Sequence, residues 1–117
     1  MKPLSMSVLA LVLAGCGGGG ADESGVVLFK PTGTLQCAPT LTTQARLDTE
    51  VAALRAAGVA VLDSRCAQDG AAHATLCGSE AGDLFSVAVS SVSVPAAQAL
   101  GFQPAGRYPG AQRMPCR

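Results

Sequence analysis

The cysteines constrain this 117-residue chain most, because four of the five lie in the segment that follows an apolar N-terminal run. Met1-Lys2 and the apolar residues 4–14 have the charge and length of a secretory signal peptide, and the run is too short for a permanent transmembrane helix. The rest of the chain is expected to fold in an oxidising compartment, where an even number of cysteines forms disulfides. Two disulfides are therefore predicted among Cys37, Cys66, Cys77 and Cys116.

Four cysteines allow three connectivities, and the spacing favours one of them. Cys66 and Cys77 flank Asp69-Gly70, a turn signal, so this pair is expected to close a short loop. Cys37 would then pair with Cys116 and hold the C-terminal segment near the first strand. On the loop-entropy model each bridge contributes about 3 to 4.5 kcal/mol, which is comparable with the whole net stability of a small domain.

The apolar run ends in Leu13-Ala14-Gly15-Cys16, which resembles the lipobox of bacterial lipoproteins. The resemblance implies that the signal peptide, residues 1–15, is removed and that Cys16 carries a diacylglycerol and an acylated amino group. Two or three acyl chains form a stable membrane anchor, whereas a single chain does not. Gly17 replaces the Asp of an inner-membrane retention signal, which implies the outer membrane, facing the periplasm, in a two-membrane host. A host with one membrane would carry the protein on the outer face of the cytoplasmic membrane.

Three further parts follow the signal peptide. Residues 16–25 hold the lipidated Cys16 and a Gly-rich tether, whose nine residues after Cys16 have a mean reach of about 15 to 18 Å. Residues 26–106 are expected to form the globular body. Residues 107–117 contain two prolines and no periodicity, and we expect them to form a C-terminal strap held by Cys116.

The body shows one strong helix signal between two apolar runs. Leu47, Val51 and Leu54 recur at helical spacing among alanines. Thr42 or Thr43 is a suitable N-cap, and Gly58 stands where a helix ends. The apolar runs at residues 26–29 and 59–62 are predicted strands, which a right-handed crossover through the helix would place parallel.

A third strand and a short second helix complete the predicted fold. Residues 84–89 alternate apolar and small side chains, and residues 95–100 form a helix with Ser93 as its cap and Gly101 at its end. The order is β-α-β-β-α, an α/β (α+β) sandwich with the helices on one face of a three- or four-stranded sheet.

The composition excludes several classes of partner. Eight basic residues balance eight acidic ones, so the chain lacks the positive surface that binds nucleic acid or anionic lipid. It contains no Trp, one Tyr and three Phe, so few aromatic side chains are present on which bases or sugars could stack. Hydrophobic residues make up 49% of the chain, so the chain is too apolar to be a disordered tail.

Chemical interpretations of the polar residues find little support. Cys66, His73 and Cys77, with Cys37 or Cys116, would complete a zinc site, but the spacing matches no short zinc motif. There is no Cys-x-x-Cys pair for a thiol-disulfide oxidoreductase and no Gly-x-Ser-x-Gly nucleophile elbow. The simpler interpretation is that His73 is an exposed or hydrogen-bonded loop residue. By the same interpretation, the carboxylates in or near the loops are turn or solvent-facing residues: Asp63, Asp69, Glu80 and Asp83. No catalytic residue, metal ligand or cofactor is predicted.

Residues 84–106 carry no charged side chain, which is unusual for a protein surface. They form either a mostly buried element of a small domain or a face that contacts another protein. The run Val27–Cys37, which reads Val-Leu-Phe-Lys-Pro-x-Gly-x-x-Gln-Cys, resembles small uncharacterised exported bacterial proteins, and this resemblance implies no activity.

The leading hypothesis is a non-catalytic, lipid-anchored protein of the cell envelope that binds another envelope protein. The alternative is a small exported inhibitor of a hydrolase, a protease or a lysozyme, that acts through the Cys66–Cys77 loop. A metal or redox protein ranks third.

Overall fold

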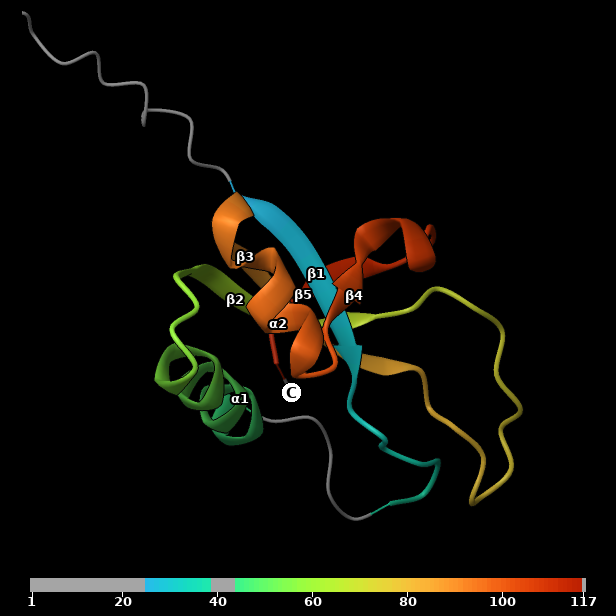
Figure 1. Cartoon of the computed structure of the whole chain (residues 1–117). Coiled ribbons are helices and arrows are strands. Elements are labelled where there is room, and N and C mark those ends of the chain that lie inside the picture. Colours follow the sequence, from blue (N-terminus) through green and yellow to red (C-terminus); the bar gives the residue numbers. More distant parts are fainter. Residues whose placement is uncertain (1–24, 39–43, 117) are drawn as a thin grey trace, which may run out of the picture.

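The computed structural model describes residues 25–38 and 44–116, which form one sheet with two α-helices packed on it (Figure 1). Predictions about Cys16, the signal peptide and the tether before Gly25 lie outside these residues. The elements run, in chain order, β1 (Val26–Pro31), α1 (Gln44–Ala56), β2 (Val61–Gln68), β3 (Asp83–Val89), the 3-10 turn η2 (Ser91–Ser93), α2 (Val94–Ala99), β4 (Gln103–Pro104), the 3-10 turn η3 (Ala105–Arg107) and β5 (Gln112–Met114).

The predicted α/β sandwich is confirmed, and its described sheet has five antiparallel strands in the order β4-β1-β3-β2-β5. The prediction of three or four strands missed the short edge strands β4 and β5, because segments of two or three residues carry no periodicity. β1 and β2 run in the same direction, as predicted, but β3 lies between them and pairs with both. β3 takes the central position because six of its seven residues are buried, which suits a strand covered on both faces.

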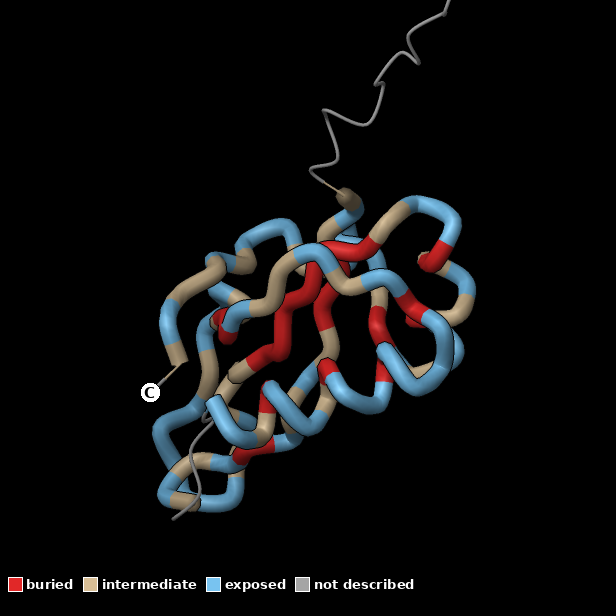
Figure 2. The backbone as a smooth tube through the Cα atoms, turned by 90° about the vertical axis from the view of Figure 1, so that its left-hand side faces the viewer, coloured by how far each residue is buried: buried red, intermediate tan, exposed pale blue. Residues whose placement is uncertain are grey.

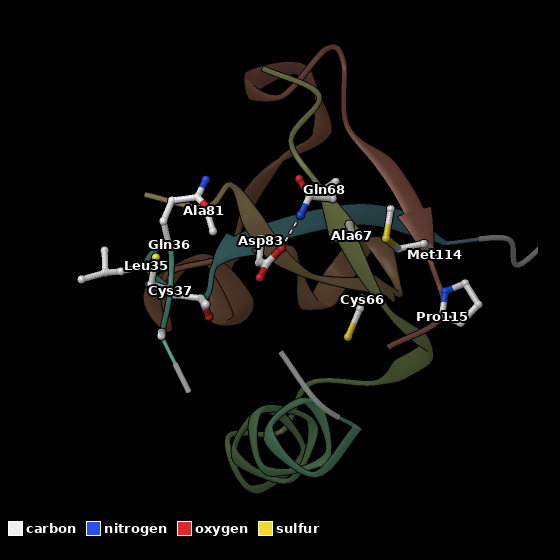
Figure 3. Close-up of a pocket in the computed structure, with 12 residues that line it drawn as sticks. Leu35, Gln36, Cys37, Cys66, Ala67, Gln68, Ala81, Asp83, Met114 and Pro115 are labelled. Atoms are coloured by element: carbon white, nitrogen blue, oxygen red, sulfur yellow. Dashed lines mark hydrogen bonds between the residues drawn. The ribbon is translucent and has the colours of Figure 1, made fainter. Parts of the chain in front are cut away.

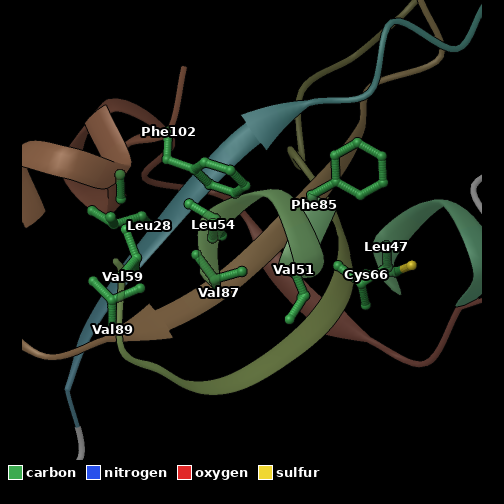
Figure 4. Close-up of a cluster of buried hydrophobic side chains, with 11 residues drawn as sticks. Leu28, Leu47, Val51, Leu54, Val59, Cys66, Phe85, Val87, Val89 and Phe102 are labelled. Carbon is green, nitrogen blue, oxygen red and sulfur yellow. The ribbon is translucent and has the colours of Figure 1, made fainter. Parts of the chain in front are cut away.

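The helix α1 packs through its predicted face. Leu47, Val51 and Leu54 are buried, and Gly58 has the positive φ of +86° that a helix-terminating glycine adopts. The predicted caps, Thr42 and Thr43, lie outside the described residues. Figure 4 shows the α1 side chains against the sheet, in a cluster that also contains the buried rings of Phe85 and Phe102.

Both helices cover the same face of the sheet. Ala97 of α2 belongs to the same core cluster as Leu47 of α1 and Leu28 of β1. The buried backbone runs through the middle of the body, between exposed outer turns (Figure 2). The predicted cap role of Ser93 is wrong: its hydroxyl caps no α2 amide but accepts the Ala60 N–H at 3.0 Å. Ser93 therefore joins the turn η2 to the segment before β2.

The C-terminal segment crosses the opposite face of the sheet. β4 pairs with β1 at one edge and β5 with β2 at the other, so residues 105–111 span the sheet between them. The Tyr108 ring contacts Phe29 edge to face at 5.9 Å, and Ala111 packs on the same small cluster. Part of the predicted strap is therefore an edge strand, because β2 offers free backbone groups at its outer edge.

The disulfides are Cys37–Cys77 and Cys66–Cys116, so the pairing predicted from the spacing is wrong. The reason is the length of β2, which continues through Gln68 rather than ending near residue 62. Cys66 is consequently a core residue, 4% exposed, opposite Met114 in the β2–β5 ladder. Its neighbour is the end of the C-terminal strap, whereas Cys77 lies beyond the sheet.

Within residues 25–38 and 44–116, none of the helices has the length and apolar character needed to cross a membrane.

Candidate functional site

Beyond the sheet, β1 and β3 continue as a looser two-stranded projection that we call the arm, residues 32–38 and 69–82. Its backbone hydrogen bonds run from Thr32 N–H to Asp83 O at 3.0 Å, from Ala81 N–H to Thr34 O at 3.0 Å and from Gln36 N–H to Ser79 O at 2.7 Å. The arm therefore extends the direction of the central strands (Figure 1).

The Cys37–Cys77 disulfide joins the two sides of the arm near its tip. Both cysteines are exposed, and Cys37 has a φ of +65°, a conformation that costs a residue other than glycine about 1–2 kcal/mol. The disulfide, with a Cα–Cα separation of 5.1 Å, and the hydrogen bond from Gly78 N–H to Gln36 O hold this turn. The tip is therefore fixed covalently despite its exposure.

A histidine–carboxylate pair organises the base of the arm. The Asp69 carboxylate accepts the Ala71 N–H at 2.9 Å and lies 2.8 Å from Nε2 of His73. Burial raises the pKa of Asp69, but these two partners outweigh it and hold the pKa below its ordinary value. Gly82 lies under this pair: a β-carbon there would come within 2.5 Å of His73 Nε2. His73 is thus a hydrogen-bonded loop residue that fixes the base of the arm.

The helix α1 supports the other side of the arm. The Arg46 guanidinium donates to Thr34 Oγ1 at 3.1 Å and to Thr32 O at 3.0 Å, and it lies 5.7 Å from the centre of the Phe85 ring. A guanidinium presents several donors in a fixed plane, so one side chain satisfies two acceptors of the arm. The arm is thereby held at its tip, at its base and along its inner side.

The exposed surface of the arm carries two large apolar side chains. Leu35 is 43% exposed and Leu76 is 69% exposed, and each lies within two residues of a cysteine of the Cys37–Cys77 disulfide. Exposed apolar side chains on a rigid projection are characteristic of contact surfaces, since their burial gains free energy while little chain entropy is lost.

A pocket of about 180 Å³ lies between the arm and the edge of the sheet (Figure 3). One cysteine of each disulfide lines it, Cys37 and Cys66, and the Gln68 amide donates a hydrogen bond across it to Asp83. Sites for small molecules usually measure about 300 to 1,000 Å³, so this space suits a side chain or a few waters better than a metabolite. The arm surface is the stronger candidate.

Among the predicted loop carboxylates, Asp63 has a basic partner and Glu80 is exposed. Asp63 lies 2.8 Å from the Arg113 guanidinium, and Arg113 also donates to Ser86 Oγ at 2.8 Å. Burial opposes the ionisation of Asp63, but the hydrogen bond from Arg113 prevails and lowers its pKa. Glu80 is exposed on the arm. These carboxylates therefore serve structural pairs or face solvent.

The alternative zinc set is not assembled. Cys66 and Cys77 belong to different disulfides, and the described residues contain no group of three or more His, Cys, Asp or Glu side chains that could hold a metal ion.

The uncharged run 84–106 begins with the buried central strand. Ser86 is 0% exposed and Ala88 is 3% exposed, so the face of β3 opposite the helices is not available for a partner. The residues that the arm exposes, Leu35 and Leu76, were not singled out by sequence reasoning. The available signal was their position in turn-rich segments, where apolar side chains have no predicted partner.

No protein-family model, curated protein or solved structure matches this chain.

Proposed function

We propose that this protein is a non-catalytic, lipid-anchored binding module of the cell envelope, and that the arm is its binding surface. The observation that carries the proposal is a projection held by the Cys37–Cys77 disulfide that exposes Leu35 and Leu76. The proposed anchor is Cys16, on the strength of the Leu13–Cys16 motif.

The position of the arm suits a membrane-anchored chain. The tether would join the body at Val26, the first residue of β1, and the arm begins after Pro31, the last residue of that strand. Six residues in extended conformation span about 20 Å. A chain anchored through Cys16 would therefore present its arm on the side of the body that faces away from the lipid.

The rigidity of the arm favours binding. A partner that buries Leu35 and Leu76 meets a surface already ordered by a disulfide, by Arg46 and by the Asp69–His73 pair. Preorganisation lowers the entropic cost of association, and apolar anchors near the centre of an interface contribute most of its free energy. The described arm carries few charges to desolvate, which suits a partner with an apolar groove.

The test is a photo-crosslinking amino acid at Leu76, introduced into the full chain and expressed in a bacterium that exports it. The matched control places the same residue at Gln98, which is exposed on α2. A discrete envelope-protein adduct at Leu76 and none at Gln98 supports the binding module. Equal adduct patterns at both positions, or none at either, would contradict it.

The hydrolase inhibitor is the second candidate, and one observation favours it. Residues 69–82 form an exposed loop that is held at both ends and displays Leu76, as a loop that occupies an enzyme cleft must. A panel of proteases and lysozymes, assayed with the protein in excess, separates the two functions. Inhibition that is lost in Leu76→Ser supports the inhibitor, whereas the binding module leaves every enzyme active.

A further inference from the structure

Among the described residues, five large hydrophobic side chains are exposed, and they lie in two groups. Leu35 and Leu76 belong to the arm. The other three are Val26 at 36%, Leu62 at 45% and Val92 at 86% exposure. Val92 stands out, since a valine in a well-formed turn is exposed almost completely.

These three residues lie at one end of the sheet, which we call the tether end. β1 and β2 begin there and β3 ends there, because Val26 and Val61 both pair with Val89. A β-carbon on Gly25 would lie 2.8 Å from Leu62 Cδ1, so Leu62 is next to the point where the chain enters the body. The turn η2, which contains Val92, lies beside the start of β1 (Figure 1).

Two of the three segments that form this patch are uncharged. Residues 56–62 and 84–106, which contain Leu62 and Val92, have no Asp, Glu, Lys or Arg, and the acidic Asp22 and Glu23 precede Val26 in the tether. The nearest charge in sequence, Asp63, is paired with Arg113 at 2.8 Å and with Arg65 at 3.4 Å. Little charge would therefore be desolvated if the tether end were covered by an apolar phase.

We propose that the tether end rests on the lipid bilayer, with Val26, Leu62 and Val92 at the level of the headgroup–acyl boundary. This inference rests on the proposed anchor at Cys16. Nine residues, 17–25, separate Cys16 from Val26, and a Gly-rich chain of that length reaches about 15 to 18 Å. The patch is the part of the body that such a tether brings closest to the lipid.

The lipid surface is the occupant that this arrangement favours over a protein. Apolar faces at a membrane interface enter the headgroup–acyl boundary by about 5 to 10 Å, and the 86% exposed Val92 can enter it without unfolding of the body. The chain shows no cluster of basic residues here, so the contact would be hydrophobic and would not require anionic lipid. The arm, at the other end of β1, would then face away from the membrane.

The absence of tryptophan in the chain provides a direct probe. Val92→Trp and Leu76→Trp each place one tryptophan at an exposed position, the first at the tether end and the second on the arm as the matched control. The full chain is exported, purified and reconstituted into phosphatidylcholine vesicles with and without brominated acyl chains. The expected result for Val92→Trp is a shift of emission to shorter wavelength and a loss of intensity in brominated vesicles, with neither change for Leu76→Trp.

A third variant controls for insertion driven by the tryptophan itself. Adding Leu62→Asp to Val92→Trp should reduce both changes while the far-ultraviolet circular dichroism stays native. Unquenched emission from Val92→Trp, or equal quenching of both probes, overturns the proposal. A shift to shorter wavelength without quenching by brominated lipid also overturns it, because it would indicate burial against protein, such as a second copy of this chain.

The intact mass separates failure of this inference from failure of the anchor. A mass without acyl chains refutes lipidation at Cys16. In that case the Cys16 thiol is coupled to a maleimide lipid and the same quenching experiment is repeated, which tests the tether end independently of cellular lipidation.

Discussion

Removal of the Cys66–Cys116 disulfide should destabilise this protein more than removal of Cys37–Cys77. The sequence separations are 50 and 40 residues, for which the loop-entropy model gives about 4 kcal/mol in each case. The entropy that the unfolded chain gains is therefore almost the same for the loss of either bridge. Any large difference must come from the folded state.

The folded state treats the two bridges differently. Cys66 is 4% exposed in the main core, so Cys66→Ala leaves a cavity that costs about 1 kcal/mol more. Both partners of the other bridge are exposed, and its loss lets Cys37 leave the left-handed region, which returns about 1–2 kcal/mol. We expect Cys66→Ala with Cys116→Ala to cost about 5 kcal/mol, and Cys37→Ala with Cys77→Ala about 2–3 kcal/mol.

The assay is equilibrium unfolding in urea of the wild type and the two double variants, followed by circular dichroism. Loss of a cross-link expands the unfolded chain, which makes the free energy of unfolding fall more steeply with urea concentration. The free energies of unfolding extrapolated to water are therefore compared, rather than the urea concentrations at the midpoints. Equal losses, or a larger loss for the Cys37 and Cys77 variant, would refute the argument from burial.

Three further outcomes follow from the same structure. A low concentration of a thiol reductant should open the exposed Cys37–Cys77 bridge before the Cys66–Cys116 bridge. Alkylation followed by peptide mass mapping should therefore label Cys37 and Cys77 first. The reverse order would contradict the burial of Cys66. Gly70→Ala should destabilise the fold by about 1–3 kcal/mol more than Gly78→Ala in thermal unfolding. Both glycines have positive φ, but only at Gly70 would a β-carbon meet backbone, 2.2 Å from the carbonyl oxygen of Gly110, and equal losses would exclude that contact. Because the pKa of Asp69 is lower in the folded state, its contribution to stability is complete above its ordinary value of 3.8 and is lost as the pH falls through the folded value. Asp69→Asn should therefore flatten the acid side of the stability–pH profile, and an unchanged profile would count against the pairing with His73.

Local sequence determined the helix α1 and the central strand. Leu47, Val51 and Leu54 were predicted and found on the buried face, because helical periodicity is a property of neighbours in the chain. Residues 84–89 likewise became β3, with the alternating Phe85, Val87 and Val89 in the main core. Two disulfides were also predictable as a number, from the even count of cysteines in the body.

Most of the candidate site was not predictable from the sequence. The prediction named residues 66–77 as a disulfide loop and His73 as a loop residue. It did not identify the arm, because residues 32–38 and 69–82 form one projection only after β1 and β3 have paired. Leu35 and Leu76 therefore look like ordinary loop residues in the sequence, and their exposure on one projection is a property of the fold.

The tertiary structure decided the disulfide partners, the strand order and the burial of the start of the uncharged run, residues 84–106. Spacing suggested that Cys66 would pair with the nearer Cys77, but pairing with β3 and β5 extends β2 and turns Cys66 into the core beside Cys116. The same pairing places β3 between β1 and β2, which buries an uncharged face that the sequence alone left open to a partner. Periodicity and capping act between residues a few positions apart, so the chain itself specifies them. Cysteine pairing and the β1–β3 and β2–β5 pairings depend on contacts across 40 residues or more, which exist only in the folded protein.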